Sequence, residues 1–481
     1  YAYFVAQGGA TSNSSVRIQT STTDNLSFSV GKSIALTADQ TSFASGKGNI
    51  TGNTTATALL TANDATNEAI EHYYLYFNIT NNPFIYTTSD NSAELLLTIT
   101  DPTGTVVTEL DGMNYVTSGG ASGFDITTYT GPIKLADYYE ISASPNKTDN
   151  WKVGVTLVNL NSDQTSNAGK SFSGVLQIGK DSQYTLATSG CTAGSNLAAC
   201  LTTLNAKYGQ AASLYHHDST LTAGAGDNSY RYSGSNPDNY VCFGSTASPC
   251  PADNLYRIIY VKSGQVKLIK ATVANSTLLG TDGDYISYTY YNWNYESDTT
   301  INSGNGSNDW STSLLNKTNL NKNFINKIGT TWTGKIATTT WQLGGADWSM
   351  VETTGIKNMY SKEMTSNAST TSSAKIGLMY ASDYGFAASP KYWSLPAYKG
   401  DGEDIRKGIK ENWLYNGGSN EWTISRDSSS AYRVFVVIKS GYMYYNYATY
   451  SAVVRPSFNL VDTTTYASGT GTKVNPIRIT V

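Results

Sequence analysis

The stretch Tyr73-Tyr74-Leu75-Tyr76-Phe77-Asn78-Ile79-Thr80 decides the fold class of the first part of the chain. Aromatic and β-branched residues dominate it, and both kinds are enriched in strands. Shorter runs of the same character lie on either side, separated by polar segments rich in turn-forming residues, at residues 34–36, 57–61, 94–100, 151–158 and 174–178. Residues 1–180 are therefore expected to form an all-β domain, a jelly roll or another β-sandwich.

The overall composition suits strands and turns better than helices. The chain of 481 residues contains 36 Tyr and 43 Gly, together with many Thr, Ser and Asn residues. These residue types favour long strands with polar outer faces, joined by frequent turns. The length predicts roughly two to four domains. We therefore expect a mainly β protein.

Charge limits the class of partner. Charged residues make up only 14% of the chain and the net charge is −4, with no basic stripe. A nucleic-acid partner is therefore not expected, because such partners select basic patches. No apolar run is long enough to span a membrane. Chains rich in Tyr and poor in Lys are typical of secreted and cell-surface proteins, which is the localisation we expect.

Four cysteines form two close pairs in the sequence, Cys191 with Cys200 and Cys242 with Cys250. Neither pair has the two-residue spacing of a zinc knuckle, and no histidine stands beside them at a ligand spacing. Two small disulfide loops, formed in an oxidising compartment, are the simplest interpretation. Reduced thiols and a split metal site are the alternatives.

The first six residues, Tyr1-Ala2-Tyr3-Phe4-Val5-Ala6, form a short apolar segment of high β-propensity. A chain that opens on Tyr is expected to have lost a secretory signal peptide. The polar run of residues 7–15 follows as a flexible tether. A tethered strand of this kind pairs either with its own sheet or with that of a neighbour. In the second case Tyr1 to Ala6 are a donor strand that links identical subunits head-to-tail.

The amino-acid composition of the chain changes after residue 180. Residues 181–250 are rich in Ser, Thr, Ala, Gly and Asn, and we expect a linker or a small disulfide-containing subdomain with one short helix at 196–204. A hairpin at 255–270 and a β-branched strand at 434–438 then predict a separate domain over residues 251–481. Within it, Arg455 is expected to be the partner of a buried carboxylate.

The N-terminal region resembles the secreted fibre subunits of the camelysin/TasA type, found in Gram-positive biofilm matrices. The resemblance lies in the start Tyr1-Ala2-Tyr3-Phe4, in the strand at 73–80 followed by Asn81-Asn82-Pro83, and in the late strand at 172–178. It implies a jelly roll whose N-terminal strand completes the next subunit.

Residues 251–481 resemble an uncharacterised domain common in surface proteins of Gram-positive bacteria. The matching segments are Tyr256-Arg257-Ile258-Ile259, the stretch from Trp310 to Phe324, and Val454-Arg455-Pro456-Ser457-Phe458-Asn459-Leu460. The pattern is similar to C-type-lectin-like and sulfatase-modifying folds, which implies an α+β domain with a small twisted sheet and long loops. It implies no sulfatase-modifying activity, because all four cysteines precede Pro251.

No residue pattern points to catalysis, a cofactor or a metal. The chain has only three histidines, which cannot supply the His-Glu-x-x-His motif of the metalloprotease label that some camelysin relatives carry. We expect His72 to be structural and His216-His217-Asp218 to be a solvated turn. The chain is therefore not expected to be an enzyme.

The sequence leaves two functions open. In the first, the chain is a structural subunit of an extracellular filament, in which residues 1–180 polymerise with identical subunits and residues 251–481 decorate the outside. In the alternative, it is a monomeric cell-surface adhesin whose last domain binds a glycan or a protein through loops rich in Trp and Tyr.

Overall fold

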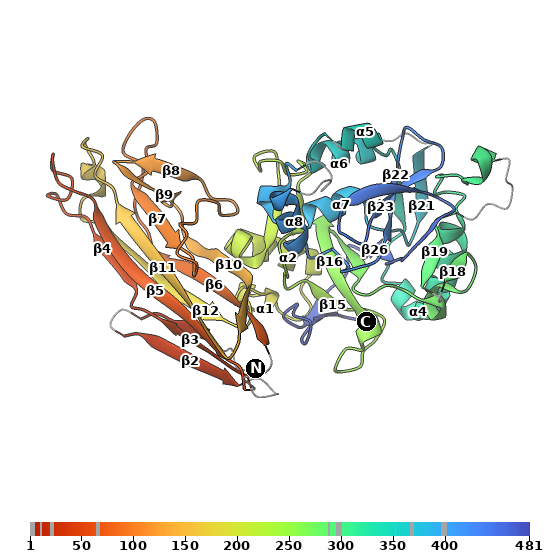
Figure 1. Cartoon of the computed structure of the whole chain (residues 1–481), viewed down its shortest axis with the longest axis horizontal. Helices are drawn as coiled ribbons and strands as arrows, with labels where there is room; N and C mark the ends of the chain where they lie inside the picture. The colour runs from red at the N-terminus through yellow and green to blue at the C-terminus, as the bar shows by residue number, and fades with distance from the viewer. Residues whose placement is uncertain are drawn as a thin grey trace. The chain divides into compact units, whose positions relative to one another are not determined.

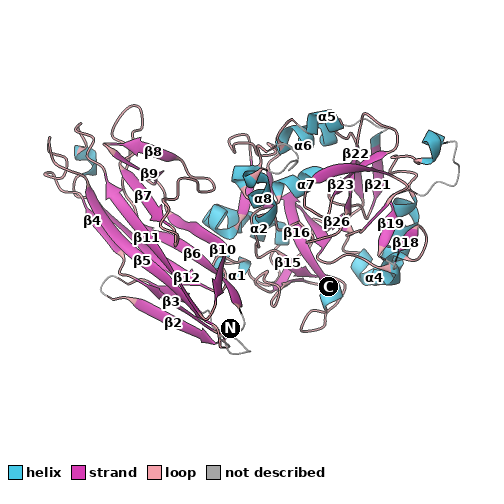
Figure 2. Ribbon diagram, viewed as in Figure 1, coloured by secondary structure: helices cyan, strands magenta, loops and turns pink. Residues whose placement is uncertain are grey.

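The computed structural model describes residues 5–9, 12–19, 24–63, 68–286, 289–294, 301–351, 353–365, 370–395 and 402–481. The chain divides into two compact units, Tyr1–Gln183 and Tyr184–Val481 (Figure 1). Antiparallel sheets dominate both units, so the protein is mainly β, as expected (Figure 2).

The first unit contains two antiparallel sheets. The described strands of the smaller sheet run in the order β1 (Val5–Gln7), β12 (Ser171–Gly179), β6 (Ala69–Asn81) and β10 (Gly131–Ala143), and β4 (Ile34–Thr37) also pairs with β12. The larger sheet has the order β2 (Ser14–Gln19), β3 (Asn25–Val30), β5 (Ile50–Thr61), β11 (Asn146–Leu157), β7 (Leu95–Thr100), β9 (Ala121–Asp125) and β8 (Tyr115–Ser118).

One hydrophobic core joins these two sheets. Alternate side chains of β6, those of Tyr73, Leu75 and Phe77, are fully buried, and they share the core with Phe28 of the larger sheet. Strand alternation explains the pattern, because residues two apart face the same side of a sheet. The Tyr73 hydroxyl donates to Asp149 Oδ2 at 2.9 Å, which satisfies its polar end inside the core. The sequence-predicted strand at 73–80 therefore lies at the centre of the unit.

The largest sheet of the second unit gathers strands from both ends of its sequence. It runs β13 (Leu214–His217), β14 (Ser229–Tyr232), β16 (Leu255–Lys262), β15 (Tyr240–Cys242), β28 (Ile477–Ile479) and β27 (Tyr466–Ser468), with β17 (Gln265–Lys270) joining β16 to β26 (Ser457–Asn459). Smaller sheets are β18 (Asp284–Ile286) with β19 (Tyr290–Asn292) and β25 (Ser451–Ala452), β20 (Thr339–Gln342) with β21 (Thr371–Ala374), and β22 (Glu421–Arg426) with β23 (Arg433–Val437) and β24 (Met443–Tyr447).

Helices lie mostly in the second unit (Figure 2). The α-helices of the described residues are α1 (Leu186–Ser189), α2 (Leu197–Tyr208), α3 (Ser276–Leu279), α4 (Ile325–Thr333), α5 (Trp348–Val351), α6 (Ile356–Met364), α7 (Ala381–Phe386) and α8 (Glu403–Lys410). The π-helix η5 spans Leu315–Phe324, and short 3-10 turns are η1 (Thr165–Asn167), η2 (Gly209–Ala212), η3 (Ala252–Asn254), η4 (Ile301–Gly304) and η7 (Pro390–Tyr392). The expected short helix is α2, with Asn196 Oδ1 capping the Ala199 amide at 3.0 Å.

The boundary between the units differs from the expected division at residues 181–250 and 251. It falls between Gln183 and Tyr184, and most of the expected linker belongs to the second unit. Strand β14 pairs with β16 through Tyr230 and Val261, and β15 pairs with the same strand through Val241 and Tyr256. The polar composition of this segment concealed three short strands, two of which, β14 and β15, pair with strands that come later in the sequence.

Candidate functional site

The N-terminal strand β1 lies on an edge of the smaller sheet of the first unit. Tyr1 to Phe4 of the expected donor strand lie outside the described residues, whereas Val5 and Ala6 are part of β1. This strand pairs antiparallel with β12 of its own chain, with Val5 opposite Gly179 and Gln7 opposite Gln177. Within one chain, the end of the segment thus completes its own sheet.

Strand β12 is paired along both of its edges. Strand β6 pairs along one edge, and two separate strands share the other, β4 at Ser171–Gly174 and β1 at Gln177–Gly179. The Gly8 amide extends this ladder by donating to the Leu176 carbonyl at 3.0 Å. The N-terminal segment therefore fills the half of the β12 edge that β4 leaves open.

Small residues let the N-terminal segment approach closely. The Ala6 side chain is fully buried in the shared core. A Cβ atom at Gly8 would lie only 2.5 Å from the Gly31 carbonyl oxygen, a distance that no side chain tolerates. Ala6 and Gly8 are two residues apart and face the same side. The position beside β12 thus accommodates small residues at 6 and 8.

The same segment continues into the second sheet. After β1, strand β2 pairs with β3, with Ser14 opposite Val30, and forms the outermost strand of the larger sheet. Between them, the Ser33 amide donates to the Gly9 carbonyl at 3.0 Å. The chain near its N-terminus therefore supplies an edge strand to each of the two sheets.

Both cysteine pairs are disulfides in the second unit, with the connectivity that their spacing predicted. Cys191–Cys200 joins the end of α1 to α2, with the Cα atoms 5.4 Å apart. Cys242–Cys250 joins β15 to the loop before β16, with the Cα atoms 5.9 Å apart. Each bond closes a short loop, which restricts the unfolded chain.

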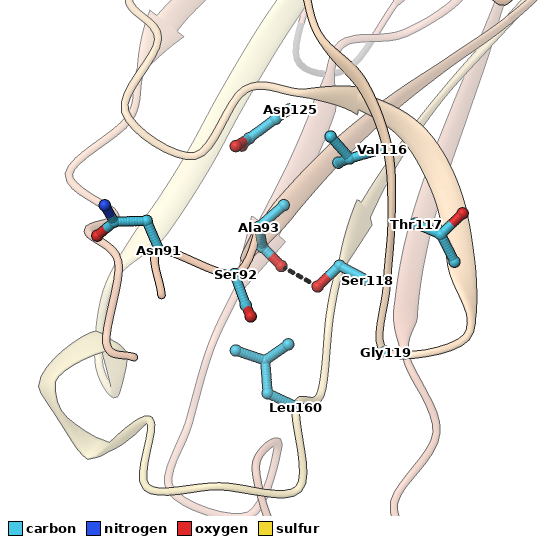
Figure 3. Close-up of a pocket in the computed structure, with 9 residues that line it drawn as sticks. All are labelled: Asn91, Ser92, Ala93, Val116, Thr117, Ser118, Gly119, Asp125 and Leu160. Carbon is cyan, nitrogen blue, oxygen red and sulfur yellow. Dashed lines mark hydrogen bonds between the residues drawn. The ribbon is translucent and has the colours of Figure 1, made fainter. Parts of the chain in front are cut away.

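Figure 3 shows a pocket of about 340 Å³ in the first unit, beside the β8–β9 hairpin. Its single ionisable lining residue among those described is Asp125, whose Oδ2 accepts a hydrogen bond from Tyr86 and whose Oδ1 accepts from Thr127. Ser118 Oγ donates to the Ala93 carbonyl at 2.7 Å. Its polar side chains are thus engaged in local structure, and the pocket presents no nucleophile paired with a base. The lining residues are Asn91, Ser92, Ala93, Val116, Thr117, Ser118, Gly119, Asp125 and Leu160.

Aromatic side chains gather around β24 in the second unit. The ring centroid of Trp348 lies 5.0 Å from that of Tyr444 and 5.3 Å from that of Tyr445, and the Arg433 guanidinium lies 4.4 Å above the Tyr445 ring. Tyr444 is 41% exposed. We call these four residues the aromatic surface. Exposed rings beside a guanidinium suit contact with a sugar face or a protein.

Buried charges form a second cluster in this unit, which the sequence did not predict. Arg231 Nη1 lies 3.0 Å from Asp383 Oδ1, and its Nη2 lies 3.2 Å from Asp227 Oδ2. Lys267 Nζ lies 2.6 Å from Asp383 Oδ2. Burial raises the pKa of the neighbouring Glu363 carboxyl to about 7. We call these five residues the buried ionic cluster. Asp227 and Arg231 are four residues apart, but the other three residues are distant in the sequence, so no local spacing could have indicated the whole cluster.

Other expectations about single residues have mixed outcomes. Arg455 is confirmed as the partner of a buried carboxylate, with its Nε 2.6 Å from Glu421 Oε1. The solvated turn expected at His216-His217-Asp218 is wrong, because both histidines lie in β13. His217 is fully buried against Phe386, and its Nδ1 accepts from the Ala225 amide at 3.0 Å. Aromatic partners from later in the chain cover this strand.

The residues that the structure describes contain no group of three or more His, Cys, Asp or Glu side chains that could hold a metal ion. None of the helices in the same ranges is both long and apolar enough to cross a membrane.

Comparison with known proteins found no match to a family model, to a curated protein or to a solved structure.

Proposed function

We propose that this chain is the structural subunit of a secreted, extracellular filament, in which Tyr1 to Ala6 complete the β12 edge of the next copy. The observation that carries the proposal is the position of β1, a three-residue strand on the edge of the smaller sheet. A short edge strand can leave one sheet and enter an identical one without rearranging the rest of the fold. The same contacts form in both cases, as in domain swapping.

The contact between β1 and β12 is weak enough for β1 to be exchanged between copies of the chain. The strand adds only a short ladder to β12 and buries one small apolar side chain, that of Ala6. Each such hydrogen bond contributes about 0.5–1.5 kcal/mol net, so the whole contact holds β1 by only a few kcal/mol. Because the contact in a neighbour is equivalent, the free energy of exchange depends mainly on the tether and on subunit concentration.

The proposal includes the finer fold assignments. The first unit, with its two sheets around one core, is proposed as the jelly roll of camelysin/TasA-type fibre subunits. The second unit, with one large sheet, several smaller sheets and several helices, is proposed as a C-type-lectin-like domain. Such a domain on each subunit would decorate the filament without taking part in the joint.

Deletion of Tyr1 to Ala6 tests the filament proposal. The truncated protein is expected to stay folded, to lose polymerisation, and to bind an added peptide of these six residues. Circular dichroism checks the fold and negative-stain microscopy checks polymerisation. Normal filaments from the truncated protein would contradict the proposal, and unfolding of the truncated monomer would show that the strand belongs to its own sheet.

A second candidate function is favoured by the aromatic surface, which suits a monomeric adhesin that binds a glycan or a protein. Replacing Trp348 and Tyr444 by Ala should abolish binding on a glycan array or to host-cell surface proteins. Replacing the equally aromatic but buried Tyr291 by Phe serves as the control, because its ring is fully enclosed. Dispersed single particles that bind a glycan would favour the adhesin over the filament.

A further inference from the structure

Lys267 and Asp383 form an ion pair that is sealed from solvent. The exposed fractions of their side chains are 0% and 1%, and Nζ lies 2.6 Å from Oδ2. Strand β17 buries all its residues but the first, so the lysine lies on a buried stretch of strand. On the other side, Asp383 is the third residue of α7, where its Oδ2 also accepts from the Tyr380 amide at 2.9 Å.

The surroundings of the amine are aromatic. The Lys267 Nζ atom lies 4.5 Å from the ring centroid of Tyr380, 5.1 Å from that of Trp341 and 5.3 Å from that of Tyr260. Burial lowers the pKa of Lys267, against the opposing effect of Asp383. Burial raises the pKa of Asp383, but Lys267 and Arg231 outweigh that effect and lower it, so the resting pair is an ammonium and a carboxylate. Transfer of a proton from Nζ to Oδ2 across the 2.6 Å contact converts two buried charges into two neutral groups, which removes the cost of keeping both charges away from water. A neutral amine next to a neutral carboxylic acid is a nucleophile next to an electrophile.

Two further members of the buried ionic cluster act on the pair: Glu363 interacts electrostatically with Lys267 and Asp383, and Arg231 contacts Asp383 directly. Glu363 is fully buried, its Oε1 accepts from the amide of Ser382, and its Oε2 has no hydrogen-bond partner among the described residues. Its raised pKa keeps a proton available near neutral pH. Arg231 Nη1 donates to Asp383 Oδ1 at 3.0 Å, the position where negative charge develops when the carboxyl carbon is attacked.

We propose that Lys267 and Asp383 become joined by an intramolecular amide bond, with Glu363 as the proton-transfer group. The Nζ lone pair attacks the Asp383 carboxyl carbon, and Arg231 stabilises the oxyanion on Oδ1. Glu363 donates its proton to the departing hydroxyl and then takes one from Nζ, so that a C–N bond forms, a C–O bond breaks and one water molecule leaves. No oxidant, reductant or co-reactant is needed.

The cross-link has a structural consequence for the second unit. It would tie β17 to α7 across 116 residues of sequence, and a covalent tie across so long a loop strongly restricts the unfolded chain. All the residues of the cross-link site lie in the second unit, so its formation does not depend on filament assembly.

Intact-mass spectrometry of the full-length, disulfide-reduced protein tests the proposal. The native chain is expected to weigh one water molecule less than its sequence, and a protease digest should contain a branched peptide that joins Lys267 to Asp383. The Lys267→Arg and Glu363→Gln variants should both have the full sequence mass. The Lys270→Arg variant is the matched control, because Lys270 is a buried lysine on the same strand whose Nζ donates to the Asp253 carbonyl, and it should retain the loss.

Full sequence mass in the native, folded protein would overturn the proposal and leave a simple ion pair. Loss of water without the branched peptide would also overturn it, since the water would then have left another site.

Discussion

At the scale of single residues, the buried carboxyl of Glu363 predicts how stability depends on pH. Its pKa rises from 4.5 to about 7 on folding, mainly through burial. The folded state therefore binds more protons than the unfolded state between these two values, and the free energy of unfolding should fall as pH rises through this window. Above the folded-state pKa the loss is complete. Urea denaturation at several pH values measures it, and Glu363→Gln should flatten the dependence.

A second residue-scale prediction concerns the Arg455–Glu421 pair. Both side chains are buried, and Arg455 also donates to the Leu414 carbonyl. Glu421→Gln should lower the free energy of unfolding of the second unit by about 3–5 kcal/mol, because it leaves a buried guanidinium without its counter-charge. Chemical denaturation checks the loss. The exposed pair Lys407–Glu403 is the control, and Glu403→Gln should change stability by less than about 1 kcal/mol.

At the scale of elements, the Cys191–Cys200 disulfide should stabilise the α1–α2 region. The bond closes a loop with a sequence separation of 9. Replacing both cysteines by Ser should lower the unfolding free energy of the second unit by about 2–3 kcal/mol. Calorimetry measures the change. The transition of the first unit is the internal control, and a loss in that transition instead would contradict the assignment.

Elements whose partners are local were predictable from sequence, and those with distant partners were not. The hairpin of β16 and β17 was expected at 255–270, because two apolar runs flank a Lys-Ser-Gly turn. Strands β13, β14 and β15 were missed, since they are short and polar, and since β14 and β15 are stabilised by β16 or β28. Strand β13 is then held by β14. The same reason hid the buried ionic cluster, in which Arg231 and Asp383 are 152 residues apart. Sequence patterns report local periodicity and carry no signal for such contacts.

At the scale of the whole molecule, the position of the boundary predicts which fragments fold. Residues 1–183 and 184–481 should each melt cooperatively when produced alone, because each has its own sheets. A fragment of residues 251–481 should be protease-sensitive, since it lacks β14 and β15, which pair with β16. Limited proteolysis and calorimetry compare the three. Cooperative melting of the fragment of residues 251–481 would contradict the boundary.

Filament assembly is also a property of the whole molecule, and trapping β1 in its partner sheet tests it directly. Gln7 and Gln177 are directly opposite each other, so Gln7→Cys with Gln177→Cys places two thiols at a spacing that a disulfide spans. A matched control is Ser29→Cys with Thr57→Cys, a pair between β3 and β5 inside one sheet.

The measurement is a non-reducing denaturing gel of oxidised, assembled protein. The account predicts a ladder of covalent multimers from the Gln7/Gln177 variant and monomers alone from the Ser29/Thr57 control. Quantitative disulfide formation with monomers alone from both variants would contradict it, because β1 would then remain in its own chain.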